Sequence, residues 1–381
     1  MRRFILILIL IILIMTIKGL SQEVGFKGQL SSWLVTKPFD DFRSQLGGRY
    51  IPELNYGHNF KEKYTLDAEA SANIWGTINF YNKDSIEYDG NIDLFRLWLR
   101  FYTSNLEIRA GLQKITFGTA QIFRPLMWFD EIDPRDPLGL TNGVYGVLGK
   151  YFFKNNANIW LWVLYGNDDP KGWELIPSAG NRPEIGGRVQ FPFISGELAF
   201  SYHHRYANLS DSLLSLLPIE NGIVPENRFG IDGKWDVGVG LWFEGSFNRQ
   251  DIEIPEIRSS KSIAGGIDYT IGIGSGLYVM GEQFWYSVSE KMFEKGETLN
   301  FTALTLNYPI SIIDNLTYMF YYDWTNNDFY NFINWGMTWD KISLYIIGYW
   351  NPDTFQVYQN VRDDQSLYAG KGFQVLFVFN H

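Results

Sequence analysis

Hydrophobic and polar residues alternate along much of the chain, most clearly in the segment KYTLDAEASANIWGTINF (Lys63–Phe80). One face of that segment would carry Tyr64, Leu66, Ala68, Ala70, Ala72, Ile74, Gly76, Ile78 and Phe80. The other face would carry Thr65, Asp67, Glu69, Ser71, Asn73, Trp75, Thr77 and Asn79. A period of two residues indicates a β-strand. A strand this long, with one apolar and one polar face, suits a wall between lipid and water better than a soluble sandwich.

The same alternation predicts about 18 strands along the chain. They lie near residues 25–35, 48–58, 63–80, 90–103, 106–116, 143–154, 158–166, 184–192, 196–206, 227–236, 239–249, 262–272, 276–287, 298–308, 315–324, 329–338, 342–350 and 370–381. Sixteen strands is the alternative, if two weak segments such as 48–58 and 342–350 are not strands.

The connections between these strands alternate in length. Short ones include Ser104-Asn105 and Trp339–Lys341, whereas long ones include Phe117–Asn142 and Ala207–Glu226. A membrane barrel with both termini in the periplasm has short periplasmic turns and long external loops. The predicted fold class is therefore an all-β, transmembrane, antiparallel up-and-down barrel, whose closure leaves no sheet edge in lipid.

The N-terminus reads MRRFILILILIILIMTIKGLSQ. Arg2 and Arg3 precede an apolar run of about 14 residues, which is short for a membrane span and typical of a signal peptide. The segment Gly19-Leu20-Ser21 fits a small-residue cleavage site. Residues 1–21 are therefore predicted to be a signal peptide, and residues 22–381 a single barrel exported to the outer membrane. An uncleaved membrane anchor is the alternative.

Composition narrows the choice of partners and cofactors. The chain has 14 Trp, 23 Tyr and 29 Phe, as expected for aromatic girdles at the two membrane surfaces. It has no cysteine, which excludes disulfides, cysteine-ligated metals and thiol nucleophiles. A net charge of −10 argues against a nucleic-acid partner, which needs a concentrated basic surface. Outer-membrane lipid is the expected surrounding, and no cofactor is predicted.

The stretch FRLWLRFYTSNLEIRAG (Phe95–Gly111) is predicted to be a hairpin with a two-residue turn at Ser104-Asn105. This turn places Arg100 opposite Arg109, Trp98 opposite Gly111 and Arg96 opposite Gln113. The outward set would be wholly apolar: Phe95, Leu97, Leu99, Phe101, Leu106, Ile108, Ala110 and Leu112. The inward set would be Arg96, Trp98, Arg100, Tyr102, Glu107, Arg109 and Gln113. A slip of one residue would place arginines in lipid, at roughly 2–4 kcal/mol each near the midplane.

Facing arginines need compensation, because like charges opposite each other are unfavourable. Glu107 is diagonal to Arg100 and offers one carboxylate. The following loop offers more charges and is predicted to fold into the lumen against the basic wall, as a constriction loop. Its charged residues are Arg124, Asp130, Glu131, Asp133, Arg135 and Asp136. Charges elsewhere that are predicted to face the lumen include Asp67, Glu69, Asp93, Lys150, Arg188, Arg205, Arg228 and Glu244.

The segment RAGLQKITFGTAQIFRPLMWFDEIDPRDP resembles the strand-plus-loop region of porin-like outer-membrane proteins of the phosphate-selective and alginate-export type. The resemblance is carried by Arg109, Gly111, Gln113, Gly118, Asp133, Pro134 and Asp136. It implies an outer-membrane channel. The lysine-rich pore lining described for the phosphate-selective proteins has no counterpart here, so the resemblance supports a porin more than a phosphate channel.

The predicted function is passive diffusion of small polar or anionic solutes through an outer-membrane channel. Arg96, Arg100 and Arg109 would form a basic wall of the pore, with Trp98, Glu107 and Gln113 beside them. Such arginines either attract anionic or hydroxyl-rich solutes or belong to a salt-bridge lattice that stiffens the barrel. The oligomeric state, monomer or trimer, is left open.

Two other functions remain open. A closed or plugged barrel would act as a surface binding protein. A barrel hydrolase would need a nucleophile beside a base, and Ser201 with His203 is the candidate pair on one strand face. His203 and His204 point to opposite faces of a strand, so they do not form a metal site.

Overall fold

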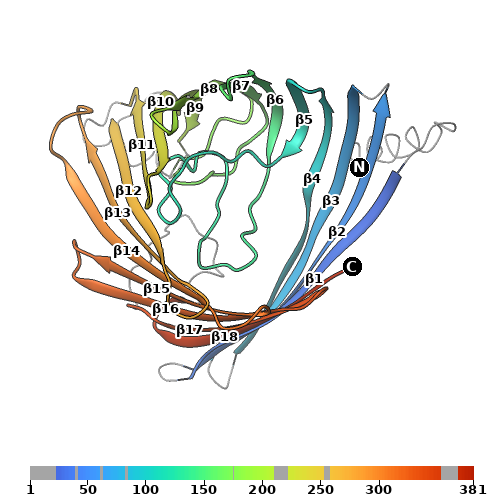
Figure 1. The fold of residues 1–381 in the computed structure, drawn as a ribbon, viewed down its shortest axis with the longest axis vertical. Coiled ribbons are helices and arrows are strands. Elements are labelled where there is room, and N and C mark those ends of the chain that lie inside the picture. The colour runs from blue at the N-terminus through green and yellow to red at the C-terminus, as the bar shows by residue number, and fades with distance from the viewer. Residues whose placement is uncertain are drawn as a thin grey trace.

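The computed structural model describes residues 23–38, 42–60, 63–81, 85–174, 176–209, 222–252, 258–352 and 368–381. The predicted signal peptide lies outside the described residues. The described residues form 18 antiparallel strands in one sheet, and β1 pairs with both β2 and β18, so the sheet closes into a barrel (Figure 1). The predicted all-β barrel and its strand number are confirmed, and both weak segments are strands.

The strands are β1 (Glu23–Lys37), β2 (Arg43–Phe60), β3 (Tyr64–Tyr81), β4 (Ser85–Tyr102), β5 (Leu106–Gln113), β6 (Val144–Phe152), β7 (Asn158–Leu164), β8 (Glu184–Phe193), β9 (Gly196–Asn208), β10 (Ile223–Asp236), β11 (Gly240–Gln250), β12 (Ser259–Ile271), β13 (Leu277–Ser289), β14 (Glu297–Pro309), β15 (Asp314–Asp323), β16 (Asp328–Thr338), β17 (Ile342–Trp350) and β18 (Lys371–Asn380). Among the described residues, no helix is long and apolar enough to cross a membrane.

The outer face of the barrel is apolar, as the alternation predicts. Exposed side chains such as Leu34, Leu54, Leu99, Ile108, Leu161, Phe200, Phe229, Ile267 and Phe377 follow one another around the wall. Their neighbours along each strand point inward, because successive side chains of a strand alternate between its two faces. The charged residues of the barrel therefore gather on the lumen side.

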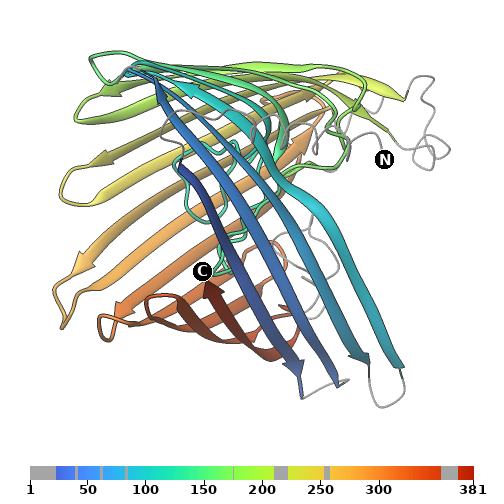
Figure 2. The same ribbon diagram turned by 90° about the vertical axis from the view of Figure 1, so that its right-hand side faces the viewer.

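The strands differ strongly in length around the barrel. β2, β3 and β4 have 18 residues each, whereas β5, β6 and β7 have 8, 9 and 7. About 9–11 residues are needed to cross a bilayer at the usual tilt. β5 and β7 fall short of this length and β6 only reaches it. β2 to β4 continue past them at the external end, where β4 (cyan) diverges from the green strands (Figure 2).

The predicted hairpin has the predicted register over most of its length. Arg100 pairs with Arg109 and Trp98 with Gly111, and the Thr103 N–H donates to the Leu106 carbonyl at 2.8 Å. The ladder between β4 and β5 ends at Leu97, so the predicted pairing of Arg96 with Gln113 is wrong.

The cause is a bulge at Phe95, since Ser71 pairs with Arg96 whereas the next residue, Ala72, pairs with Leu94. A bulge inserts one extra residue into one strand and changes its direction. The Phe95 ring lies 3.9 Å from the Arg96 guanidinium carbon, so the prediction that Phe95 continues the outward apolar row is also wrong.

Candidate pore and constriction loop

The loop after β5, residues 114–143 and here called L3, folds into the barrel (Figure 1). Its middle is almost completely buried: Phe123 is 0 % exposed and Leu126 1 %. Other buried apolar side chains of L3 are Ile115, Phe117, Ala120, Ile122, Met127, Trp128 and Phe129. L3 has 30 residues, and contacts of both its backbone and its side chains hold it in this position.

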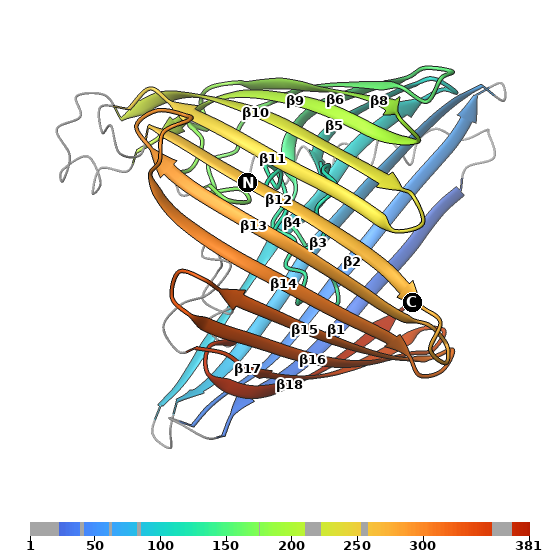
Figure 3. The same cartoon turned by 60° about the vertical axis from the view of Figure 1, so that its left-hand side comes forward.

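Two inward-pointing carboxylates bind the backbone of L3. Glu244 of β11 accepts hydrogen bonds from the N–H groups of Thr119 (2.6 Å) and Ala120 (2.8 Å), and from that of Leu126. Glu282 of β13 accepts from three successive N–H groups, those of Gln121, Ile122 and Phe123. These bonds replace the water that a loop backbone would otherwise require. They fix L3 to the wall formed by β11 to β13 (Figure 3).

Gly118 permits the close approach of L3 to Glu244. Its φ angle is +102°, which favours glycine, and an added Cβ would lie 2.4 Å from a carboxylate oxygen of Glu244. The glycine of the porin-like motif thus has a physical role, because it turns the chain so that the next two N–H groups meet the carboxylate.

Aromatic packing extends the contact between L3 and the wall. The Phe123 ring stacks on Phe284 of β13 at 5.0 Å and lies 5.9 Å from Phe301 of β14. The Arg135 guanidinium carbon lies 5.3 Å from the Phe332 ring of β16. L3 therefore reaches across the lumen to the opposite side of the barrel, and nearer its origin Phe117 and Phe129 also pack on β6 and β7.

The charged residues of L3 form ion pairs within the loop. Arg124 binds Asp130 through two hydrogen bonds of 3.0 and 2.9 Å, and Arg135 binds Asp133 at 2.9 Å. The Asp136 carboxylate accepts from the N–H groups of Leu138 and Leu140.

These pairs correct the prediction that the loop carboxylates lie against the basic wall. A 2.8 Å hydrogen bond from Arg96 to the Thr141 carbonyl joins that wall to L3 close to the end of the loop. Glu131 lies near this end, and its N–H donates a 2.8 Å hydrogen bond to the Thr141 hydroxyl oxygen. The loop is bound by the far wall because that wall supplies acceptors for its backbone.

The facing arginines of β4 and β5 are compensated by one carboxylate of β3 and one of β5 itself. Arg100 donates to Asp67 of β3 at 2.9 Å, and Arg109 donates to Glu107 at 3.1 Å. Glu107 also lies 4.0 Å from Arg100, on the predicted diagonal. The Trp98 ring lies 4.8 Å from the Arg109 guanidinium carbon and 5.5 Å from that of Arg100. All of these groups are partly exposed to the lumen.

Gln113 and Gly111 fix the end of β5. Gln113 is 0 % exposed and donates to the carbonyls of Arg109 (3.2 Å) and Gly146 (3.1 Å). Gly111 has a φ of +120°, and an added Cβ would lie 2.1 Å from the Leu97 carbonyl oxygen. Both motif residues therefore shape the strand from which L3 departs.

A small cavity of about 110 Å³ separates the tip of L3 from β1, β2 and β18. Asp133 and Asp136 line it on the loop side, and Arg49 lines it on the β2 side. Ser31, Trp33, Gln45, Tyr368 and Gln374 complete this polar lining. Burial raises the pKa of the Asp136 carboxyl, and the nearby Asp133 raises it further, while the N–H groups bound to it oppose the rise.

Arg49 faces the lumen and is not among the pore residues predicted from the sequence. It pairs with Ser31 and with Trp75, which the alternation places on the polar side of its strand. The alternation along β2 therefore contains the information that Arg49 faces the lumen. The segment 48–58 was one of the two with a weak alternation, so this information was not used.

Comparisons with known proteins show a fold shared with solved structures. No protein-family profile matches the sequence, and no curated protein matches it. Among solved structures, OccAB1 of Acinetobacter baumannii has a TM-score of 0.57 at 11% identity, over 95% of this chain and 97% of that one. OccK5 (OpdH) of Pseudomonas aeruginosa has a TM-score of 0.57 at 10% identity, over 94% and 98%. Wzi of Escherichia coli, an outer membrane protein involved in group 1 capsule assembly and a carbohydrate-binding β-barrel, has a TM-score of 0.51 at 12% identity, over 92% and 84%.

The chain has the fold of an outer-membrane porin. At these identities the likeness concerns the closed antiparallel barrel alone. The roles of individual side chains therefore rest on their geometry in this chain.

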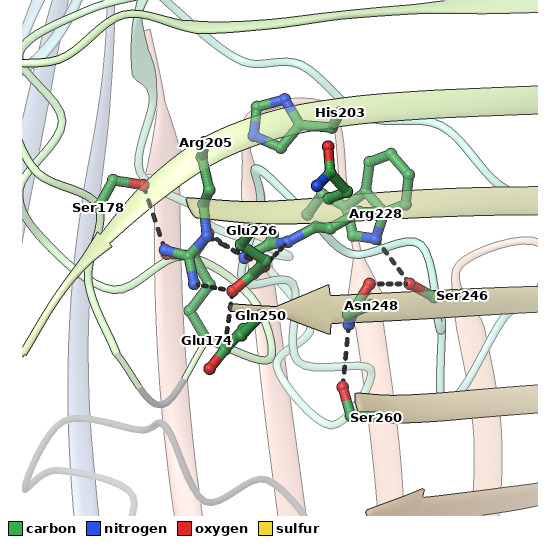
Figure 4. Close-up of polar contacts among 12 residues, drawn as sticks. Glu174, Ser178, His203, Arg205, Glu226, Arg228, Ser246, Asn248, Gln250 and Ser260 are labelled. Carbon is green, nitrogen blue, oxygen red and sulfur yellow. Dashed lines mark hydrogen bonds and ion pairs between the residues drawn. The ribbon is translucent and has the colours of Figure 1, made fainter. Parts of the chain in front are cut away.

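A second polar cluster lies on the lumen side of β8 to β10, under the loop of residues 165–183, here called L4 (Figure 4). Arg205 binds Glu226 at 2.9 Å and Glu174 at 3.2 Å, and Arg228 binds Glu174 at 2.9 Å. Gln250 donates to Glu226 at 2.6 Å. The four ionised groups are 5 % exposed or less, so this cluster is a buried lattice that ties L4 to the wall.

Ser201 and His203 are both buried on the lumen face, yet they bind other partners. The Trp162 indole N–H donates to His203 Nδ1 at 3.1 Å, so the imidazole proton lies on Nε2, 3.1 Å from Glu184. The Ser201 hydroxyl oxygen accepts from Arg188 at 3.2 Å. Both nitrogens of His203 are occupied by groups other than Ser201, which leaves the proposed hydrolase without an activated nucleophile.

Proposed function

We propose that the protein is an outer-membrane channel in which small polar solutes diffuse passively along the side of the lumen formed by β2 to β6. The observation that supports this most is an asymmetry of exposure. The side chains of Arg100, Asp67, Arg109 and Glu107 are 27, 20, 18 and 16 % exposed. Inward side chains on the opposite wall, such as Glu244 (0 %), are covered by L3. Water therefore has access to one side of the lumen.

The chemistry of this side favours polar solutes with hydrogen-bonding groups. Arg49, Arg100, Arg109 and Lys150 supply positive charge, and Glu53, Asp67, Glu69 and Glu107 supply negative charge. Each sign lies close to the other, so the net field along the wall is small. We infer weak selectivity between anions and cations, with Trp33, Trp75 and Trp98 offering ring faces to sugar-like solutes.

Within this proposal, the basic wall of Arg96, Arg100 and Arg109 serves two purposes. Arg100 and Arg109 are paired and yet partly exposed, so they stiffen the wall and still present charge to solutes. Arg96 is 7 % exposed and holds the end of L3 through Thr141, so its purpose is to position the loop. Asp133 and Asp136 at the L3 tip, facing Arg49, would form the narrowest part of the path.

The decisive experiment is conductance of the folded, purified protein in planar bilayers. Discrete current steps that scale with salt concentration are expected. Folded protein, judged by its heat-dependent mobility on gels, that inserts and yet gives no current would overturn the proposal.

Filling of the lumen by L3 and L4 favours one second candidate, a closed barrel that binds a ligand at its external loops. The same bilayer experiment separates the two, because a closed barrel binds without conducting. We propose no catalytic step in either case, since Ser201 and His203 are bound to other groups.

A further inference from the structure

The barrel wall is interrupted between β4 and β6. The ladder of β4 with β5 ends at Leu97, but β4 continues for twelve further residues to Ser85 and, among the residues that the structure describes, pairs there with β3 alone. β5 stops at Gln113, where the chain turns inward as L3. Residues 85–96 of β4 therefore form a sheet edge on the side of β6.

A cleft of about 610 Å³ occupies this interruption. Its lining includes Asp93, which faces the lumen, and Leu94 and Tyr145, which face outward with exposures of 36 and 40 %. It also includes Phe129 of L3. A cleft lined by both faces of the wall and by the infolded loop passes through the thickness of the wall.

The cleft lies within the apolar band rather than above it. A band about 25 Å tall, crossed by strands tilted about 45°, takes up about 11 residues of strand. Phe101 is the first outward residue of β4 at the turn. If the apolar band begins there, eleven residues of β4 carry it to about Asn91. Leu94 is inside it, in its external half, and the outward residue Ile92 next to it is 71 % exposed.

Side chains of β4 satisfy backbone groups along the interrupted edge. Asp89 accepts from the Gly90 N–H at 2.7 Å, and Asn91 accepts from the Ile92 N–H at 2.8 Å. Arg96 donates to the Phe95 carbonyl at 2.6 Å. An open edge in lipid is otherwise unfavourable by several kcal/mol per unsatisfied group. Edges blocked in this manner resist pairing with another strand, which argues against a partner protein that adds a strand here.

We propose that this cleft is a lateral opening that takes up a single-chain amphiphile with a cationic head group from the outer half of the membrane. The apolar chain would lie against Leu94 and Tyr145, which continue the lipid-facing surface. The head would lie among Asp93, Asp168 and Asp169, which line the same cleft. Lys171 also lines it, but its ammonium is bonded to Ser178 at 3.0 Å and Glu184 at 3.3 Å. The charge presented to a head group is therefore negative.

The absence of native cysteine allows a direct test with nitroxide labels in lipid vesicles. One label replaces Leu94 (Leu94→Cys). The matched control, Ala72→Cys, sits opposite Leu94 in the β3–β4 ladder at the same level, with strands on both sides. Each label is tested for access by oxygen, which dissolves in lipid, and by a neutral nickel chelate, which dissolves in water. Dodecyltrimethylammonium and dodecyl sulfate are then added at equal concentrations that leave the vesicles intact.

Three results are expected. Both reagents reach the label at position 94, whereas the label at position 72 is reached by oxygen alone. Dodecyltrimethylammonium lowers nickel access at position 94 to the level of position 72, and dodecyl sulfate does not. The double variant Asp168→Asn, Asp169→Asn in the Leu94→Cys background reduces this difference between the two surfactants.

Labels at positions 94 and 72 that are equally shielded from nickel would mean a sealed wall and overturn the proposal. An equal response to the two surfactants would overturn the assignment of a cationic head group. Bilayer conductance of the same variants is measured in parallel. The lateral opening is a separate proposal from the aqueous path through the lumen. The label experiment can contradict the first while the conductance supports the second, and the reverse.

Discussion

The carboxylate of Glu282 on β13 accepts a 2.7 Å hydrogen bond from the N–H of Phe123 in L3. This bond joins a strand to a loop that departs from the opposite side of the barrel. Together with the bonds to Glu244, it determines which half of the lumen L3 fills. The remaining half carries the partly exposed charges of β2 to β6. Glu244 and Glu282 do not line the proposed aqueous path, but by fixing L3 they determine where that path runs.

Removal of the Glu282 carboxylate should release L3. In Glu282→Ala, the N–H groups of Gln121, Ile122 and Phe123 lose their acceptor, at about 1–3 kcal/mol for each buried group left unsatisfied. We expect a larger and noisier single-channel conductance in planar bilayers, from protein that still folds as a barrel. Glu294→Ala, at an exposed site of the loop between β13 and β14, is the control and should leave the conductance unchanged. A folded Glu282→Ala variant with wild-type current would contradict the anchoring role.

Neutralising Arg100 should change ion selectivity more than stability. The side chain is 27 % exposed, so its pair with Asp67 is expected to contribute only ~0.2–1 kcal/mol to stability. In Arg100→Gln, the lumen loses a positive charge and Asp67 loses its partner, which favours cations. Reversal potentials in a salt gradient should shift toward cation preference, with a nearly unchanged thermal transition. Lys341→Gln, exposed at a periplasmic turn, carries the same charge change and should shift neither.

Acidification should raise the preference of the channel for anions through Asp136. Burial raises the pKa of this carboxyl, so it becomes protonated at a higher pH than an exposed aspartate does. As the pH falls through that raised pKa, the L3 tip loses negative charge, and the ratio of anion to cation permeability should rise. Asp136→Asn should show the raised ratio already at neutral pH and should lack this step. A pH profile identical in wild type and Asp136→Asn would show that Asp136 lies away from the path.

Substitution of Gly111 should impair folding of the barrel. Gly111→Ala places a Cβ 2.1 Å from the Leu97 carbonyl oxygen at a φ of +120°, where backbone strain alone costs about 1–2 kcal/mol. We expect a lower urea midpoint for unfolding in detergent, read from tryptophan fluorescence. Gly149→Ala in β6 is the matched control, since nothing lies within 4 Å of its added Cβ. Equal midpoints for the two variants would contradict the steric role.

Much of the wall could be predicted from the sequence, because its information is local. A two-residue turn at Ser104-Asn105 fixes the register of a hairpin, and a one-residue slip would turn Arg100 into lipid. The bulge at Phe95 was missed although a signal existed. Asp93 and Arg96 were both predicted to face the lumen, and residues three apart share a strand face only if an extra residue lies between them.

The destination of L3 could not be predicted, because the information is not local. Its apolar and acidic residues indicated an infolded loop, and the loop is infolded. The choice between the two walls depended on Glu244 and Glu282, which lie more than a hundred residues further along the chain. Glu244 was predicted to face the lumen, but a lumen-facing carboxylate equally suits an ion pair, and nothing in the pattern shows that it accepts backbone N–H groups.

The central claim is that water follows the β2 to β6 side of the lumen and is excluded from the side under L3. Cysteine accessibility tests it most directly, since the native chain has no cysteine. Asn55→Cys lies on the inward face of β2, on the proposed path, and Ser262→Cys lies on the inward face of β12, where Ser262 is 6 % exposed. A charged, water-soluble thiosulfonate reagent should react quickly at position 55 and reduce the single-channel current, and should leave position 262 unmodified and the current unchanged. Rapid modification and block at position 262, with none at position 55, would place the path on the other side and contradict the account.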